Sequence, residues 1–293
     1  MDLTLLNGPT GLDRSDSTPG ADQVIRPSRA RPKVSVIVAH RGEVKSGCVR
    51  ALKDQDYPSY EVLYISEGTE AQAQNAGVRR ATGEIVMFTN SDVYVPTNWI
   101  SRHVERISQG YDMVGGGVFW SGDVYALAWN QRPKDAQLGF GFSNASIRKD
   151  YVLSRGGIPL LPSFQDGAFV FAALNDGGRM LIDRSIIVIH DHPFRSMRGC
   201  FRRACNYERG LFIILRVIHG RAIGPTPIRP SSATNQIREW LCIEGVKVWK
   251  EQQIRANLFR FLFIRLFAFR LGSLWGILTS PRHPTWSDIV NIH

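Results

Sequence analysis

Three short apolar runs alternate with two amphipathic stretches in the first third of the chain. The runs are residues 34–40 (VSVIVAH), 60–66 (YEVLYIS) and 84–90 (EIVMFTN), and such β-branched runs are typical of strands buried on both faces of a sheet. Residues 42–58 and 70–83 place apolar side chains at near-helical spacing, and the second stretch is expected to end at Gly83. The order strand, helix, strand, helix, strand predicts an α/β fold with a doubly wound sheet.

Polar residues follow each of these expected strands. His40 follows the first strand, Ser66 and Glu67 follow the second, and Asp92 follows the third. In doubly wound sheets, ligands bind beyond the carboxyl ends of the strands. We therefore expect these side chains to surround one crevice.

The pattern is less regular further along the chain. Residues 101–163 mix glycine-rich turns with short apolar pieces and predict no defined elements. The stretch QDGAFVFAALNDGG predicts a helix from about Gly167 that ends at two glycines, and RSIIVIHDH predicts a strand. His190 and His192 lie at the end of this strand, on one side of it, because side chains alternate along an extended chain.

Composition and charge narrow the class of protein. The chain has 293 residues, of which 43% are hydrophobic and 21% charged, so it can bury one large core. A net charge of +10 indicates an anionic partner: nucleic acid, nucleotide phosphates or an acidic membrane surface. No nucleic-acid-binding sequence pattern accompanies this charge, so nucleic acid is not expected as a partner. Four scattered cysteines without metal-ligand spacing fit a cytoplasmic protein.

The two ends of the chain differ from its centre. Residues 1–31 lack the pattern of a secretory signal and are expected to form a mobile leader. Residues 32–215 are expected to form the folded domain, and residues 216–293 a helical extension rich in Arg and Phe. Arginines recur every five residues from Arg255 to Arg270, which disfavours a membrane-spanning helix. Two interpretations stay open: a helix lying on an anionic membrane surface, or helices that pack on the domain or on a second subunit.

Three motifs occur in order within the central part. They are LKDQDYPSYEVLYIS, then QNAGVRRATGEI, then the turn Asn90-Ser91-Asp92. This ordered set resembles the family 2 glycosyltransferases, and the resemblance extends from Lys33 to about Gly210. It implies a GT-A type fold, with a doubly wound, mostly parallel sheet flanked by helices and, here, a C-terminal helical extension. It also implies transfer of a sugar from a nucleotide-sugar donor to a hydroxyl acceptor, with inversion.

The turn after the third strand implies a metal site. A departing diphosphate needs charge compensation, usually from a divalent ion held by oxygen ligands. The family turn usually reads Asp, any residue, Asp, so the resemblance implies that Asp92 contacts Mn²⁺ or Mg²⁺, while Asn90 replaces a carboxylate. His190 and His192 match a position that completes the metal or diphosphate site. The sequence leaves open whether these imidazoles bind metal, bind phosphate or only serve the fold.

A second motif, SFQDGAF, resembles the Glu-Asp motif of the family. Asp166 falls on the aspartate that acts as general base on the acceptor hydroxyl, and Gln165 replaces the glutamate. A base is needed because a sugar hydroxyl is a poor nucleophile until its proton is withdrawn. An alternative is that Asp166 only caps the following helix.

The resemblance implies further contacts with donor and acceptor. His40, Arg41 and Glu67 are expected near the donor nucleotide, together with Asn90, Ser91 and Asp92. Asn75 either contacts the donor or only braces the neighbouring strand. Asn144 and Arg148, in GFSNASIRKD, are expected to shape the sugar pocket with Gln165, or else to belong to a turn.

Two functions from different classes follow from these residues. The first is a glycosyltransferase of polysaccharide or glycolipid synthesis, peripheral on the inner face of the plasma membrane, whose acceptor is a saccharide or a lipid-linked saccharide. The second is a degenerate protein that binds nucleotide sugar or partner proteins without turnover. Asn90 and Gln165 favour the second function, whereas Asp92, Asp166 and His190 favour the first.

Overall fold

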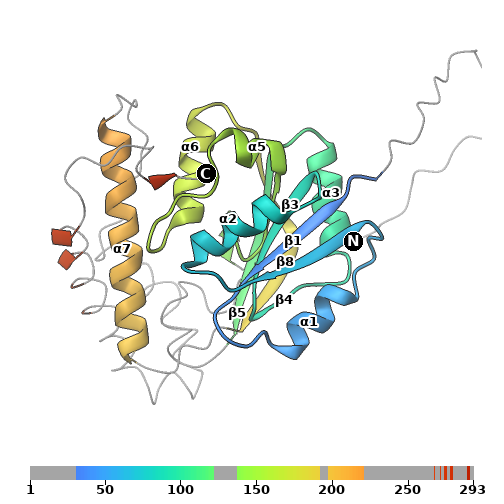
Figure 1. Ribbon diagram of the computed structural model, residues 1–293, viewed down its shortest axis with the longest axis horizontal. Helices are drawn as coiled ribbons and strands as arrows, with labels where there is room; N and C mark the ends of the chain where they lie inside the picture. Colours follow the sequence, from blue (N-terminus) through green and yellow to red (C-terminus); the bar gives the residue numbers. More distant parts are fainter. Residues whose placement is uncertain are drawn as a thin grey trace, which may run out of the picture. The chain divides into compact units, whose positions relative to one another are not determined.

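The computed structural model describes residues 31–121, 137–191 and 197–220, and eight single positions between 267 and 290. The chain divides into two units, Met1–Arg31 and Pro32–His293, and all described helices and strands belong to the second (Figure 1). The expected division into a leader, a domain and a helical extension stays a prediction.

The first third of the chain folds in the predicted order. Its elements are β1 (Val34–Ala39), α1 (Ser46–Lys53), β2 (Tyr60–Ile65), α2 (Glu70–Arg80) and β3 (Ile85–Asn90). Both β2 and β3 pair with β1 in parallel. Helix α2 begins with a capping box between Thr69 and Gln72. It ends at Arg80, so the prediction that this helix ends at Gly83 is wrong by a few residues.

The remaining elements complete one sheet of eight strands. They are β4 (Val93–Tyr94), α3 (Trp99–Ser108), β5 (Met113–Ser121), β6 (Gln137–Gly139), β7 (Ala145–Arg148), α5 (Lys149–Ser154), α6 (Gln165–Asn175), β8 (Met180–Asp191) and α7 (Met197–Gly220). The strand order is β2-β1-β3-β7-β5-β8-β4, and β6 pairs with β5. Strands β5 and β8 are parallel, whereas β4, β6 and β7 make antiparallel pairs. The predicted α/β class of GT-A type is confirmed, and the sheet is mixed because of these three short strands.

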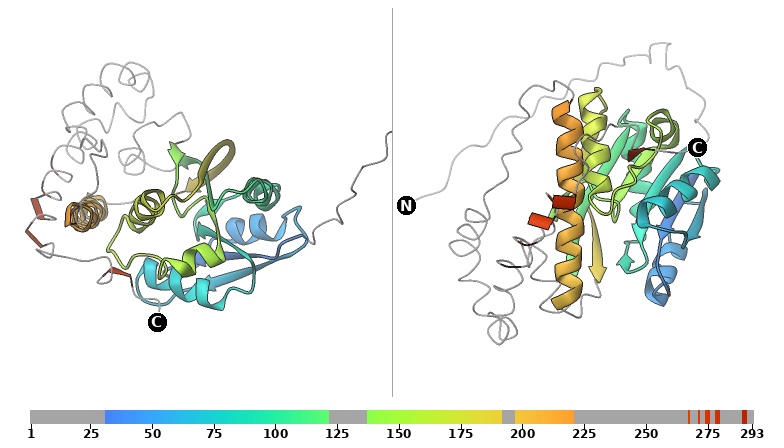
Figure 2. Two further views of the ribbon diagram at one scale, coloured as in Figure 1. Left: turned by 90° about the horizontal axis from the view of Figure 1, so that it is seen from above. Right: turned by 60° about the vertical axis from the view of Figure 1, so that its left-hand side comes forward.

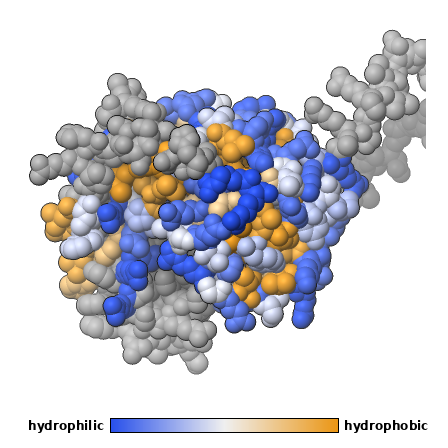
Figure 3. Space-filling view, in the orientation of Figure 1, coloured by the Kyte–Doolittle hydropathy of each residue, from blue (hydrophilic) through white to orange (hydrophobic). Residues whose placement is uncertain are grey.

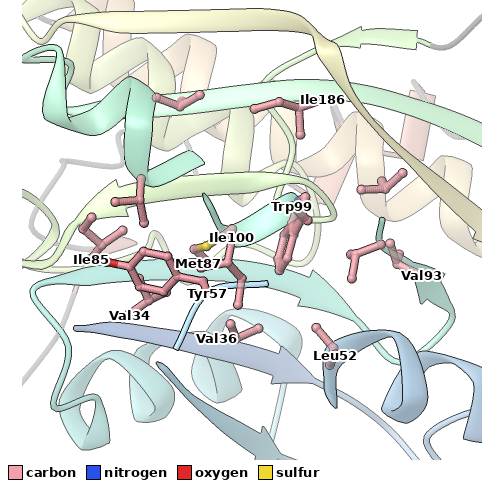
Figure 4. Packing of buried hydrophobic residues seen from close by; sticks show 14 of the residues in the cluster. Val34, Val36, Leu52, Tyr57, Ile85, Met87, Val93, Trp99, Ile100 and Ile186 are labelled. Carbon is pink, nitrogen blue, oxygen red and sulfur yellow. The ribbon is translucent and has the colours of Figure 1, made fainter. Parts of the chain in front are cut away.

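Helices cover both faces of the sheet. Along β1, Val34, Val36 and Val38 pack into the cluster that α1 and α3 cover, and Figure 4 shows this cluster around Trp99. Ile37 points to the opposite cluster, which α2, α5 and α6 cover. This alternation explains the continuous apolar run in the sequence, because a strand buried on both faces has no polar side to expose.

Helix α7 packs against α6 outside this three-layer core (Figure 2). Ile213, Ile214 and Val217 of α7 form a third apolar cluster with Leu161 and with Ala168 of α6. The helix runs through the expected domain boundary at residue 215 without interruption.

The described surface is mostly hydrophilic on the face drawn in Figure 3, with apolar residues in separate patches. The most exposed large apolar residues lie near the C-terminal end of the chain: Phe267, Leu271, Leu274, Trp275 and Leu278 are 52–71% exposed. Within the described part of the chain, the structure contains no helix of sufficient length and hydrophobicity to cross a bilayer.

Candidate active site

The carboxyl ends of the first three strands lie in one row. Ala39 at the end of β1 is level with Ile65 at the end of β2 and with Asn90 at the end of β3. The residues that follow each strand are therefore brought to one edge of the sheet, as the sequence predicted. We call this edge the strand-end edge.

Asp92 and His190 meet at the strand-end edge. The two-residue strand β4 pairs Val93 with His190, and the N–H of Asp191 donates to the Asp92 carbonyl over 2.9 Å. This pairing brings Asp92 Oδ1 within 3.0 Å of His190 Nε2. The Asp92 side chain is 14% exposed and that of His190 is 2% exposed, so a ligand reaches the pair from the Asp92 side.

The two residues before Asp92 are fixed by the start of α1. The Asn90 carbonyl accepts from Cys48 Sγ over 3.5 Å, and the Ser91 carbonyl accepts from the Lys45 N–H over 3.1 Å. The Asn90 side-chain oxygen is buried and has no hydrogen-bond partner within the described part of the chain. Because leaving such an acceptor unpaired costs about 1–3 kcal/mol, a donor group on a ligand would be favourable there.

Lys45 belongs to this site, although the sequence analysis missed it. Its Nζ lies 2.5 Å from Asp191 Oδ2 and donates to the Asp191 carbonyl over 2.9 Å. Both side chains are about one-third exposed or more, at 33% and 40%. Lys45 thus ties the turn after β3 to the end of β8 and brings a positive charge to the edge. Its position between the first strand and the first helix was the signal available in the sequence.

The protein side chains at this edge could hold a divalent ion only if a substrate supplied further ligands. Among the described residues, no group of three or more His, Cys, Asp or Glu side chains could hold a metal. Asp92 and His190 could supply two ligands, and His192 lies outside the described residues. Mg²⁺ and Mn²⁺ are commonly held by one or two carboxylates together with substrate phosphates and water. The pair therefore fits an ion that arrives with a diphosphate.

The predicted donor residues after β1 and β2 also lie at the strand-end edge. His40 Nδ1 is 2.7 Å from the Gly42 carbonyl oxygen, and Arg41 is exposed. The Glu67 carboxylate lies 2.5 Å from Arg80 of α2, with both side chains about half exposed. Glu67 is therefore accessible, and its charge is balanced by Arg80.

Asn75 has a structural role in this fold. Its side-chain amide donates to the Ile158 carbonyl and accepts from the Ile158 N–H, each over 2.8 Å. Asn75 is 2% exposed, so its side-chain amide is not accessible to a nucleotide-sugar donor. Of the two roles predicted for Asn75, the structure favours bracing, and the partner is the loop at residue 158.

Asn144 is buried below the edge, at 1% exposure. Its Oδ1 accepts from Trp99 Nε1 over 2.8 Å and lies 3.1 Å from His103 Nε2. Its Nδ2 donates to the carbonyls of Gly117 and Ile186. All its polar atoms are used inside the protein, so the structure does not support a role in the sugar pocket. We call Asn144, Trp99, His103 and their partner Ser146 the interior network.

Arg148 lies at the opposite edge of the sheet. It is level with Ile85, the first residue of β3, whereas Asn90 is the last. The Arg148 side chain is exposed and pairs with Asp150 over 3.1 Å. The prediction that Arg148 shapes the sugar pocket is not supported, because about five residues of extended strand, roughly 16 Å, separate it from Asn90.

Asp166 lies in the first turn of α6, close to the strand-end edge. Its carboxylate accepts from the N–H of Gly167 over 2.8 Å and from the N–H of Phe142. Phe142 stacks on Phe88 of β3 at 4.7 Å between ring centroids, and Ser143 accepts from Thr89, next to Asn90. The loop before β7 therefore connects Asp166 to the end of β3. Gln165, which precedes Asp166, is 6% exposed.

The surroundings of Asp166 suit a base. Burial raises the pKa of the Asp166 carboxyl, and the negative charge of Glu70 raises it further. The Gly167 and Phe142 N–H groups and the charge of Arg203 act in the opposite direction. A carboxylate with a raised pKa accepts a proton more readily. The expected alternative of a helix cap is only partly met, because the residue that precedes the helix is Phe164 and not Asp166.

Part of this chain is similar in sequence to known glycosyltransferases. Residues 31–158 match the model of the family described as glycosyl transferase family 2. Glycosyltransferase AglE of Haloferax volcanii is 28% identical over 120 residues, which cover 30% of this chain and 40% of that relative. The chain thus spans less than half the length of the curated relative that it matches.

A solved structure shares the fold of this chain. The mannosyltransferase PcManGT from Pyrobaculum calidifontis, in complex with GDP-Man and Mn²⁺, aligns with a TM-score of 0.52 at 16% identity, covering 85% of this chain and 86% of that one. S. aureus TarS aligns at 13% identity with a TM-score of 0.44, covering 81% of each chain. At the identity of the mannosyltransferase, the likeness concerns the fold alone. Residues 31–158 of this chain are thus similar to glycosyl transferase family 2.

Proposed function

We propose that this protein transfers a sugar from a nucleotide-sugar donor to a hydroxyl group of an acceptor, with inversion at the anomeric carbon. One observation carries the proposal. The same edge of the sheet brings together the Asp92–His190 pair and Asp166, a carboxylate with a raised pKa. Part of the chain also matches a glycosyltransferase family.

The proposed reaction assigns one task to each group. The acceptor hydroxyl oxygen attacks the anomeric carbon while its proton passes to the Asp166 carboxylate. The bond between the anomeric carbon and the diphosphate oxygen breaks, and its electron pair leaves with the nucleoside diphosphate. Lys45 holds the diphosphate end of the donor by its positive charge, and Asp92 and His190 would hold a divalent ion beside it. A bound Mn²⁺ or Mg²⁺ would supply charge compensation for the diphosphate.

A thermal-shift experiment tests the donor site. The purified chain is heated with a panel of nucleoside diphosphates and sugar nucleotides, with and without Mn²⁺ or Mg²⁺. GDP-mannose is in the panel because the structurally similar mannosyltransferase holds it. A ligand at about 100 times its dissociation constant should stabilise the fold by roughly 2.7 kcal/mol. We expect metal-dependent stabilisation by one nucleotide.

Two variants make this experiment specific. Asp92→Ala should abolish the stabilisation, whereas Asp150→Ala should retain it, because Asp150 is exposed at the opposite edge of the sheet. No response of the wild-type chain to any nucleotide would contradict the proposal. Stabilisation without sugar transfer to any hydroxyl acceptor would favour the alternative function, a protein that binds nucleotide sugar without turnover, to which Asn90 and Gln165 point.

We propose further that the acceptor is a lipid-linked saccharide and that the protein works at the anionic inner face of the plasma membrane. The five exposed apolar residues from Phe267 to Leu278 have spacings of four, three, one and three, which place them on one side of a helix. Residues 252–287 contain five arginines and no acidic residue. An apolar stripe flanked by arginines suits the headgroup region of an anionic bilayer.

Sedimentation with lipid vesicles tests this surface. The chain should bind vesicles of phosphatidylcholine mixed with phosphatidylglycerol more strongly than phosphatidylcholine alone. Changing Leu274, Trp275 and Leu278 together to Gln should abolish binding. The matched control changes Leu153, Leu160 and Leu174, which are exposed elsewhere, to Gln and should bind as the wild type does. Equal loss in both triple variants would exclude a specific membrane surface.

A further inference from the structure

One face of α7 contacts the segment that carries Asp166. Arg203, Tyr207, Gly210, Ile214 and Val217 follow one another at spacings of four, three, four and three, so they form one stripe along the helix. Ile214 and Val217 pack on Leu161 and Ala168, on either side of residues 163–166. The stripe therefore continues past the end of the apolar cluster toward Asp166.

Gly210 lets the two backbones approach closely. A Cβ atom at this position would overlap the carbonyl oxygen of Ser163. Any other residue would push α7 away from the segment or force the segment to move. The contact is therefore between main chains, which gives it a fixed geometry.

Phe164 holds a strained conformation next to this contact. Phe164 has a φ of 68°, and no other non-glycine residue in the described part of the chain has a positive φ. Such a conformation costs of order 1–3 kcal/mol and persists where the surroundings enforce it. The Phe164 ring packs edge-on against Tyr207 at 5.2 Å, and it occupies the space above Gly167. Tyr207 and Gly210 thus hold Phe164, the residue that directly precedes α6.

Asp166 comes two residues after this clamped position. Its carboxylate sits beside Gly141 and accepts from the Phe142 and Gly167 N–H groups. The charged groups that face it are Glu70 from α2 and Arg203 from α7. A small rotation at Phe164 would turn the first turn of α6 and move this carboxylate away from its two N–H donors.

We propose that α7 is the positioning element of Asp166: Gly210 and Tyr207 fix the backbone at residues 163–164, and Arg203 faces the carboxylate. This inference rests on the proposed function only in giving Asp166 the role of base. It extends the site to α7, a helix in the last third of the chain that lies outside the family match. Arg203, Tyr207 and Gly210 are positioning residues, which act on the reaction through Asp166.

The test measures the Asp166 carboxyl directly and needs no substrate. Protein labelled with ¹³C at aspartate is titrated by NMR, and the Asp166 signal is assigned with Asp166→Asn. Arg203→Met should raise the pKa of Asp166 above that of the wild type, because a facing positive charge is lost. Arg202→Met should leave the pKa unchanged, since Arg202 is the neighbouring arginine but is exposed.

A second pair of variants separates positioning from stability. Gly210→Ala should shift both the carboxyl signal and the pKa of Asp166. Gly177→Ala also destabilises the protein, because Gly177 has a φ of 80° at the far end of α6, but it should leave Asp166 unchanged. The inference is overturned if Arg203→Met matches Arg202→Met, or if Gly210→Ala lowers the melting temperature without altering the Asp166 signal.

Failure of the proposed function would look different. If the pKa of Asp166 responds to α7 as expected but the wild-type chain transfers no sugar, the proposed function fails while the link between α7 and Asp166 stands. If sugar transfer occurs and all four variants leave the Asp166 signal as in the wild type, the function stands and the positioning role is wrong.

Discussion

The strand-end edge and the interior network are two polar clusters on one sheet, and each contains a buried histidine. At the edge, His190 faces a carboxylate, Asp92, that solvent can reach. In the interior, both ring nitrogens of His103 meet neutral side chains, Asn144 and Ser146, and the residue is fully buried. The first cluster keeps a charge where a ligand can meet it, whereas the second closes every hydrogen bond inside the protein.

This difference separates function from stability. A polar group that is satisfied inside the core fixes the packing of its neighbours and has nothing left to offer a ligand. Asn144 therefore joins α3, β5 and β8, although its sequence motif pointed to a sugar pocket. We expect substitutions at the edge to change activity and substitutions in the interior network to change stability.

The largest effect should come from the Asp166 carboxylate. Asp166→Asn keeps the size and most hydrogen-bonding capacity of the side chain but cannot accept the acceptor proton. Removal of a general base lowers kcat by about 10²- to 10⁴-fold. KM for the acceptor should change little. Steady-state kinetics check this, with the exposed Asp150→Asn as the control, and an unchanged kcat would remove Asp166 from the reaction.

Substitutions in the interior network should lower the stability of the fold. Asn144→Ala would leave Trp99 Nε1 and the carbonyls of Gly117 and Ile186 without their partner. We expect the free energy of unfolding to fall by roughly 3 kcal/mol, since each unpaired buried group costs about 1–3 kcal/mol. Urea unfolding measures this loss. Asn175→Ala, at an exposed position, is the control and should stay within about 0.5 kcal/mol of the wild type.

The interior histidine should make stability depend on pH. Burial lowers the pKa of His103 from 6.5 to about 4, so the unfolded chain binds a proton more readily than the folded protein does between these values. The contribution of His103 to the free energy of unfolding is therefore fully present above pH 6.5. It falls as the pH drops toward 4, by at most about 3 kcal/mol.

Urea unfolding between pH 7 and pH 4.5 isolates this effect. Glu61 and Asp183 have pKa values lowered to about 2, so their contributions to stability are lost mainly below pH 4.5. His103→Phe should be less stable at pH 7 but should show a flatter dependence on pH. An equal slope in the variant and the wild type would assign the pH dependence to another group.

The smallest effect is expected at the far edge of the sheet. Arg148→Ala breaks an exposed ion pair with Asp150, and such pairs contribute about 0–1 kcal/mol. We expect the transfer rate to be unchanged and the free energy of unfolding to fall by less than about 0.5 kcal/mol. A clear rise in the acceptor KM would restore the role in the sugar pocket that the sequence suggested.

Much of the first half of the fold could be predicted from local pattern. The strands around Val36, Val62 and Met87 are runs whose neighbours on the chain are amphipathic helices, and parallel pairing follows from that order. Asp92 could be placed at the strand-end edge because it comes two residues after the end of β3. His190 could be placed at a strand end by the same argument.

The second half could not be predicted in the same way. Strand β4 has two residues and β6 has three, too short for any periodicity. The register shift between Gly116 and Gly117, where β5 pairs with β8, places Ile186 against Asn144, and no local signal indicates that contact. Arg148 was misplaced because its strand runs antiparallel to β3 and ends at the opposite edge.

The sequence by itself determined the α/β order and the residues that end each parallel strand, because these depend on neighbours along the chain. Only the tertiary structure decided which polar residues face a ligand. Asn75 and Asn144 turned inward to backbone groups far away in sequence, Lys45 reached Asp191, and α7 came to lie against residues 163–164. Such contacts join segments many residues apart, so they depend on how the layers pack and cannot be read from any single stretch of the chain.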